Sequence, residues 1–161
     1  MSLRRFLRIG FIALFLFAAV FADASSLPSK LGKIGFPTSG SKEVQRHFLR
    51  GVAALHSFWY EEALAAFRQS TKVDPNFVMG YWGEAMAHNR TLHEQQDAQA
   101  AKEALAKVKA ITQVTARERA YFDAVKLLYG KGDKRSRDEA YSHAMEKVHR
   151  DYPEDLEAAC F

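Results

Sequence analysis

The stretch HFLRGVAALHSFWYEEALAAFRQSTKVDPNFVMGYWGEAMAHN, residues 47–89, decides the fold. Apolar residues recur in it at spacings of three and four, which is the period of an α-helix. Small residues stand where neighbouring helices would have to touch, and large apolar residues fill the space between them. The stretch therefore predicts two helices, a tight turn and a third helix. The small positions are Gly51, Ala54, Ala63 and Ala66, and the large ones are Phe48, Leu55, Tyr60, Leu64 and Phe67.

The same helical spacing extends to both sides of this stretch. We expect Ser41 to cap a first helix that runs to about His56, followed by a second helix over Tyr60–Lys72. Asp74 is expected to cap the third helix, with Pro75 in its first turn, where a missing N–H costs nothing. Later in the chain, we expect a fourth helix over residues 94–111 and the first turns of a seventh over residues 155–161. Two capping boxes mark the helices between them. The fifth is expected from Thr115–Glu118 to Gly130, and the sixth from Ser136–Glu139 to Tyr152. The sequence thus predicts an all-α fold.

Length and charge restrict the class of protein. The chain has 161 residues, enough for one domain, and a formal net charge of +4. Half of that charge lies in residues 1–24, so the remainder is too weakly basic to indicate a nucleic-acid partner or an anionic membrane surface. The single cysteine, Cys160, cannot form an internal disulfide.

The N-terminus has the three parts of a signal peptide. Three arginines precede an apolar run over residues 9–21, and Ala22-Asp23-Ala24 is a small-x-small site, so cleavage is expected after Ala24. The alternative is a membrane anchor, but the run is shorter than the roughly 20 apolar residues that span a bilayer. We therefore expect a secreted or periplasmic protein with no membrane attachment after cleavage. Residues 25–40 are expected to form an extended entry segment.

Residues 44–77 form a 34-residue unit that resembles a tetratricopeptide repeat. The features that carry the resemblance are a small residue within the first helix, an aromatic near the turn, a small residue facing the first helix, an aromatic four residues later and a final proline. These are Gly51, Tyr60, Ala63, Phe67 and Pro75. Tyr81 and Ala85 then follow 34 residues after His47 and Gly51, which repeats the first-helix pattern.

The resemblance implies a right-handed solenoid of three helical pairs plus the start of a seventh helix, over residues 41–161. The chain also resembles the N-terminal part of larger exported, poorly characterised tetratricopeptide proteins, so we expect the array to be truncated at its C-terminus. The implied function is non-catalytic protein–protein interaction. The alternative is that the chain is a fragment whose activity, enzymatic or not, lies in missing sequence.

No residue pattern predicts catalysis, a cofactor or a metal. The sequence contains no Gly-rich phosphate loop, CxxC, HExxH or Gly-x-Ser-x-Gly motif. Glu84 and His88 share one helical side, with His93 beyond, but a polar face near a loop is favoured over a metal site. His56 is expected to bond a turn carbonyl rather than act as a base. A solvated loop is favoured over an anion site for the basic stretch 131–137.

The concave face made by the first helix of each pair is the expected binding surface. Phe48 and Val52 occupy positions where a clamp for a peptide carboxylate would need polar residues, so we expect an apolar groove that accepts a hydrophobic peptide or helix. The missing helices of the same array are the alternative occupant. The predicted groove residues are Gln45, Phe48, Val52, Met79, Trp82, Met86 and Asn89.

Overall fold

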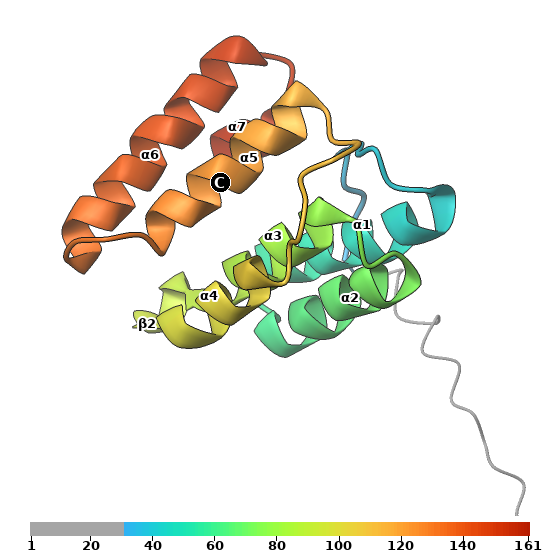
Figure 1. Cartoon of the computed structure of the whole chain (residues 1–161), viewed down its shortest axis with the longest axis horizontal. Coiled ribbons are helices and arrows are strands. Elements are labelled where there is room, and N and C mark those ends of the chain that lie inside the picture. Colours follow the sequence, from blue (N-terminus) through green and yellow to red (C-terminus); the bar gives the residue numbers. More distant parts are fainter. Residues whose placement is uncertain (1–30) are drawn as a thin grey trace, which may run out of the picture.

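The computed structural model of the protein describes residues 31–161. The expected signal peptide over residues 1–24 lies outside this range. Within the described part, no helix combines the length and the apolar character needed to cross a membrane. The described chain is mostly helical, as the sequence predicts (Figure 1).

The first three helices pack side by side. Helix α1 spans Lys42–His56, α2 spans Tyr60–Val73 and α3 spans Val78–Ala87. The Ser41 side chain accepts a hydrogen bond from the Val44 N–H, which confirms the expected cap of α1. Helix α2 contacts both α1 and α3, so the three form one block (Figure 1).

Glycines allow this block to pack closely around one aromatic ring. The ring of Phe67, on α2, lies against Gly51 of α1 and Gly83 of α3. A Cβ added at Gly51 would lie 2.6 Å from the ring, and one at Gly83 would overlap it as well. Gly51, one of the small residues predicted from the sequence, therefore stands at a helix contact.

The start of α3 differs from the prediction. Asp74 and Pro75 lie in the turn between α2 and α3, and α3 begins only at Val78. The Asp74 carboxylate accepts a hydrogen bond from the Asn76 N–H at 2.9 Å, within the turn itself. The Tyr81 hydroxyl donates to the Pro75 carbonyl at 3.0 Å, which holds the turn against α3. The Asp74 side chain therefore binds the Asn76 N–H inside the turn. It does not cap α3, which begins two residues after Asn76.

A short hairpin replaces the beginning of the predicted fourth helix. Strands β1 (Asn89–Arg90) and β2 (Gln95–Gln96) pair antiparallel around the 3₁₀ turn η2 (Thr91–His93). Asp97 then caps α4, which spans only Ala98–Ala106 instead of residues 94–111. Strands of two residues are too short to leave an alternating pattern in the sequence, so composition alone suggested helix.

Three helices complete the chain. They are α5 (Ala116–Leu128), α6 (Lys134–Asp151) and α7 (Leu156–Cys160). The capping box of Thr115 and Glu118 forms as predicted. The second predicted box, at Ser136, is wrong: Asp133 caps α6 and accepts a hydrogen bond from the Ser136 N–H at 2.9 Å.

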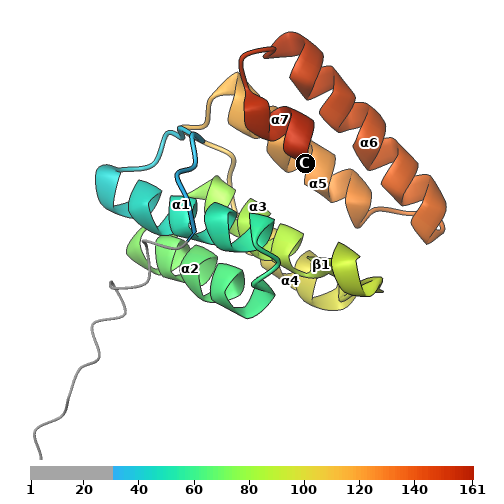
Figure 2. The same cartoon turned by 180° about the vertical axis from the view of Figure 1, so that it is seen from behind.

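The entry segment connects the two parts of the fold. The ring of Phe36 is fully buried, with centroid distances of 5.1 Å to Phe48, 5.6 Å to Trp82 and 4.9 Å to Tyr121. These partners belong to α1, α3 and α5, so one residue outside the helices contributes to the core of both halves. Helix α7 follows α6 and contacts it, and Figure 2 shows α7 in front of α5 in that view.

Candidate functional site

The residues predicted to line an open groove lie mainly in the core. Phe48, Val52, Met79 and Trp82 have no exposed surface, and Met86 is 7% exposed. Gln45 is partly buried, and its side-chain amide donates to the Phe36 carbonyl at 2.6 Å. The expectation of an open groove at these positions is therefore corrected, except that Met86 and Asn89 border a pocket described below.

The chain's own later segments fill the expected groove. Phe161 places its ring 5.0 Å from that of Trp82 and 4.9 Å from that of His56. Tyr121 of α5 approaches Trp82 edge-on at 5.6 Å. Helical periodicity shows which face of a helix is apolar, but it does not show which later segment covers that face, and this is why the groove was predicted to be open.

Polar contacts hold α7 in this position. His56 Nε2 lies 2.6 Å from a carboxylate oxygen of Glu157, which corrects the expectation that His56 bonds a turn carbonyl. Asp155, the cap of α7, accepts hydrogen bonds from Arg117 at 2.5 Å and from the Tyr121 hydroxyl at 2.8 Å. Burial raises the pKa of the Asp155 carboxyl, but these two hydrogen bonds outweigh burial and hold the pKa below its ordinary value of 3.8.

A pocket of about 380 Å³ opens beside α7, where the α1–α2 turn, the hairpin and the start of α6 meet. Its volume is within the range of small-ligand and side-chain pockets. Apolar and aromatic side chains make up most of the lining, and polar side chains come from the end of α1, the hairpin and α6. The lining residues are Leu55, His56, Phe58, Tyr60, Met86, Asn89, Thr91, Leu128, Lys134, Asp138, Tyr141, Cys160 and Phe161.

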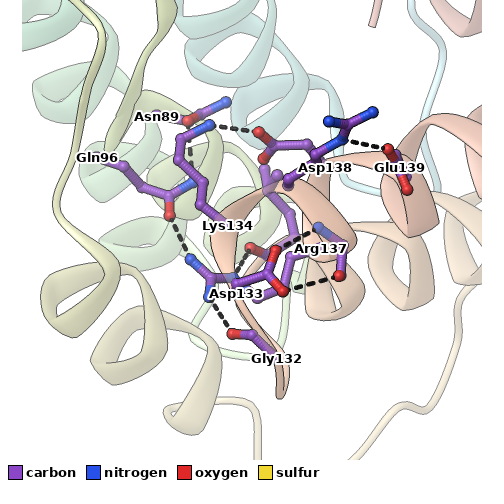
Figure 3. Close-up of polar contacts among 11 residues, drawn as sticks. Asn89, Gln96, Gly132, Asp133, Lys134, Arg137, Asp138 and Glu139 are labelled. Atoms are coloured by element: carbon purple, nitrogen blue, oxygen red, sulfur yellow. Dashed lines mark hydrogen bonds and ion pairs between the residues drawn. The ribbon is translucent and has the colours of Figure 1, made fainter.

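The polar side of the pocket is already organised by internal pairing (Figure 3). Lys134 pairs with Asp138 one turn along α6. Asn89 accepts a hydrogen bond from the Gln96 side chain at 3.1 Å, and Gln96 in turn accepts one from Arg137 at 3.1 Å. This chain of contacts connects the hairpin to the first turns of α6.

Arg137 is a structural residue of the predicted basic loop. Its guanidinium donates to the carbonyls of Leu128 at 3.1 Å and Gly132 at 2.7 Å, in addition to Gln96. The first of these carbonyls belongs to the last turn of α5, so Arg137 caps that helix. Residues 134–137 of the stretch 131–137 form the start of α6, so the prediction of a solvated loop is wrong for them. The Arg137 guanidinium binds two carbonyls and the Gln96 side chain instead of an anion.

Phe58 borders the pocket with an unusual backbone conformation. Its φ is +57°, a left-handed value that favours glycine, and half of its side chain is exposed. The N–H of Phe58 donates to Leu55 and the N–H of Trp59 donates to Ala54, which is the pairing of a Schellman motif at the end of α1. A phenylalanine thus stands where glycine would carry no steric cost.

Phe58 belongs to an exposed apolar surface around Tyr60. Trp59 is 49% exposed and Leu92, in the hairpin, is 61% exposed. The Leu92 N–H lies 3.4 Å from the Tyr60 hydroxyl, and the Phe58 and Tyr60 ring centroids are 6.4 Å apart. We call Phe58, Trp59 and Leu92 the apolar edge. Trp59 lies in the turn before α2, so the helical period could not predict its exposure.

Glu84 of α3 and the histidines that follow this helix make separate contacts. Glu84 is buried and pairs with Arg68 at 2.8 Å and with Lys107 at 3.5 Å. His88 is buried, and no hydrogen-bond partner reaches its Nε2. His93 is exposed and packs against the Tyr60 ring. Among residues 31–161, no cluster of three or more His, Cys, Asp or Glu side chains could hold a metal ion.

No family model matches the chain, and no curated protein or solved structure matches it either. The pocket and the apolar edge therefore carry the inference of function.

Proposed function

We propose that residues 41–161 form a tetratricopeptide-like interaction module without catalytic activity, which binds a partner protein at the apolar edge. The order of helix contacts supports the repeat architecture. Helix α3 contacts both helices of the first pair, α1 and α2, as well as its own partner α4, whereas α5 has its contact with the second pair through α3. In a solenoid of helical pairs, the first helix of each unit contacts both helices of the preceding unit in this way.

The apolar edge is the observation that carries the proposal. Single exposed apolar residues are ordinary on protein surfaces, but Phe58 and Trp59 are adjacent and both half exposed, and Phe58 also lines the pocket. The exposed Leu92 belongs to the same surroundings, because its N–H lies 3.4 Å from the Tyr60 hydroxyl. Tryptophan and phenylalanine contribute large contact areas at interfaces, and tryptophan is enriched among the residues that dominate binding energy. A partner protein would cover this surface.

The state of the candidate acid and base groups supports a non-catalytic role. His56 is paired with Glu157, and Glu84 is paired with Arg68 and Lys107. The pocket thus contains a histidine whose Nε2 already contacts a carboxylate, so this nitrogen is engaged rather than free to activate a nucleophile.

Site-specific photocrosslinking in the producing cell would test the partner surface. We expect a photoreactive amino acid at Trp59 to give a discrete adduct with another protein, identified by mass spectrometry. The same amino acid at Val73, an exposed apolar residue at the other end of α2, is the matched control and should give no such adduct. Equal adducts at both positions, or none at Trp59, would contradict the proposal.

We further propose that the module is exported, on the basis of the sequence of residues 1–24. N-terminal sequencing of the protein recovered from the producing cell should begin at Ser25. Recovery of the intact N-terminus would contradict export by cleavage after Ala24.

A further inference from the structure

We propose that the pocket beside Phe58 is an anchor site for one large, uncharged apolar side chain carried by an extended peptide segment of the partner. The inference rests on the proposed interaction function and specifies the chemistry that the partner presents. Four features of the pocket support it: the apolar lining, the pairing of the charges, the polar groups at the mouth and the backbone of Phe58.

The inner lining suits a large apolar side chain. Leu55, Met86 and Leu128 come from three different helices and are buried or nearly so, while Tyr60 and Phe161 contribute aromatic rings from two further segments. Five separate segments thus converge on one volume of about 380 Å³. A convergent apolar pocket of this kind is where anchor residues of interfaces insert.

The charges of the pocket exclude a charged anchor. Lys134 is paired with Asp138, and His56 is paired with Glu157. Outside the lining, Arg90 is paired with Glu61 and lies over the ring of the lining residue Tyr60. Each charge has an internal partner, so an acidic or basic side chain would gain no counterion and would still lose its hydration.

The mouth of the pocket offers polar groups for a peptide backbone. Thr91 is exposed and Asn89 is partly buried, and both belong to the hairpin. Amide and hydroxyl groups can each donate to a carbonyl and accept from an N–H. An occupant with an apolar side chain and a flanking peptide unit matches both the interior and the mouth, which a purely apolar ligand does not.

The backbone of Phe58 suits a residue with a role at the pocket surface. A left-handed φ is unfavourable for a bulky residue, and the Schellman motif requires no aromatic at this position. Strained residues of this kind are concentrated at binding sites. We assign Phe58 as the residue that closes one side of the pocket over the inserted anchor.

Capped amino acids are suitable probes for the chemistry of the anchor. N-acetyl-leucinamide and N-acetyl-phenylalaninamide should shift the NMR signals of the Asn89 side-chain amide and the Met86 methyl, with saturation in the millimolar range that is expected of fragments this small. N-acetyl-lysinamide and N-acetyl-glutamic acid amide should not shift them. Saturable shifts with the charged probes as strong as with the apolar ones would overturn the proposal, as would no saturable shift with any probe.

Two substitutions separate the role of Phe58 from folding. Phe58→Gly removes the ring and relieves the backbone, so we expect an unchanged circular dichroism spectrum and at least a fivefold loss of affinity for N-acetyl-phenylalaninamide. Phe58→Ala removes the ring and keeps the strain, and it should lose affinity to the same extent. Val73→Ala should bind as the unchanged protein does. Full affinity in both Phe58 variants would overturn the assignment.

Failure of the anchor-site proposal in the probe-binding experiment can be told apart from failure of the interaction function in the photocrosslinking experiment. An adduct at Trp59 together with no probe binding would retain the interaction module and reject the anchor pocket. If sedimentation shows a dimer whose formation protects the apolar edge, the occupant is a second copy of the chain, and the proposal of a partner peptide is overturned.

Discussion

The block of α1, α2 and α3 and the pair of α5 and α6 are stabilised in different ways. All ten residues of α3 are buried, and glycines bring its backbone against the Phe67 ring. Helix α6 has 18 residues but buries only Tyr141, Met145 and Val148. Its exposed surface is instead covered with ion pairs between residues three or four apart.

The α1–α3 block is stabilised mainly by tight packing, whereas the surface of α6 is stabilised by exposed ion pairs. A tightly packed block is sensitive to an added methyl group because its interior has no free volume. A helix with exposed ion pairs tolerates substitution because water screens both charges of each pair, so that each pair contributes little to stability. The substitutions below test this contrast, beginning with the largest expected effect.

We expect Gly83→Ala to destabilise the protein by about 3 kcal/mol, at the upper end of the cost of overpacking. The added Cβ would lie 2.3 Å from the Phe67 ring, which also lies against Gly51 and so has little room to move. Urea unfolding followed by circular dichroism would measure the change. Gly35→Ala, where the added Cβ meets nothing within 4 Å, is the control. Combining Gly83→Ala with Phe67→Leu should recover part of the loss, and no recovery would show that the ring is not the obstacle.

We expect Glu118→Ala to lower the free energy of unfolding by about 2 kcal/mol. The Glu118 carboxylate is buried and accepts hydrogen bonds from the N–H groups of Ser39 and Thr115, both at 2.7 Å. Removing it leaves these donors without their acceptor. Glu139→Ala on α6 removes an exposed carboxylate and should change the same unfolding curve only slightly. Equal effects of the two substitutions would contradict the contrast between the regions.

A smaller change in the free energy of unfolding is expected from the titration of His88, as a dependence of stability on pH. Burial lowers the pKa of His88 below its ordinary value of 6.5, against the opposing influence of Asp97 and Glu84. The folded state therefore binds fewer protons than the unfolded state, and the free energy of unfolding should fall as the pH drops below about 6.5. His88→Gln should flatten this part of the curve, measured by urea unfolding between pH 7.5 and pH 5.

The smallest effect is expected from the ion pairs of α6. Arg135→Ala removes a pair with Glu139 at 2.9 Å and should change stability by less than about 0.5 kcal/mol. Arg50→Ala is the comparison in the first block, because the Arg50–Glu62 pair joins α1 to α2 and both side chains are about one quarter exposed. A double-mutant cycle for each pair would give the coupling energies, and a larger coupling on α6 would contradict the expectation.

The sequence predicted the helices best where a cap and an apolar stripe coincide. Helix α1 has both Ser41 and regularly spaced core residues, and its bounds were predicted to within one residue. The start of α6 was placed too late because Ser136 has the pattern of a cap, while Asp133 provides the actual one. Aspartate and serine are both favoured caps, so the sequence does not distinguish Asp133 from Ser136. Only the backbone conformation shows which of the two residues precedes the helix.

The pocket could not be predicted because its walls come from segments distant in sequence. Phe161 reaches Trp82 across 79 positions, and the ring contact depends on how α7 folds back over α1 and α3. Phe58 gave no signal either, since a left-handed backbone at a phenylalanine is contrary to its local preference. Met86 and Asn89 were identified from the helical face of α3, and they are the two predicted groove residues that border the pocket.

The attachment of the entry segment to α5 has a consequence for the order of folding. Ser39 binds Glu118, and the Pro37 carbonyl accepts from Arg117 at 2.9 Å, so both contacts close loops of about 80 residues. Closing such loops costs more chain entropy than forming a neighbouring helix pair, so long-range contacts tend to form late. The segment around Phe36 should therefore remain open to proteases until α5 has docked, and its protection in a pulsed-proteolysis time course would report the last step of folding.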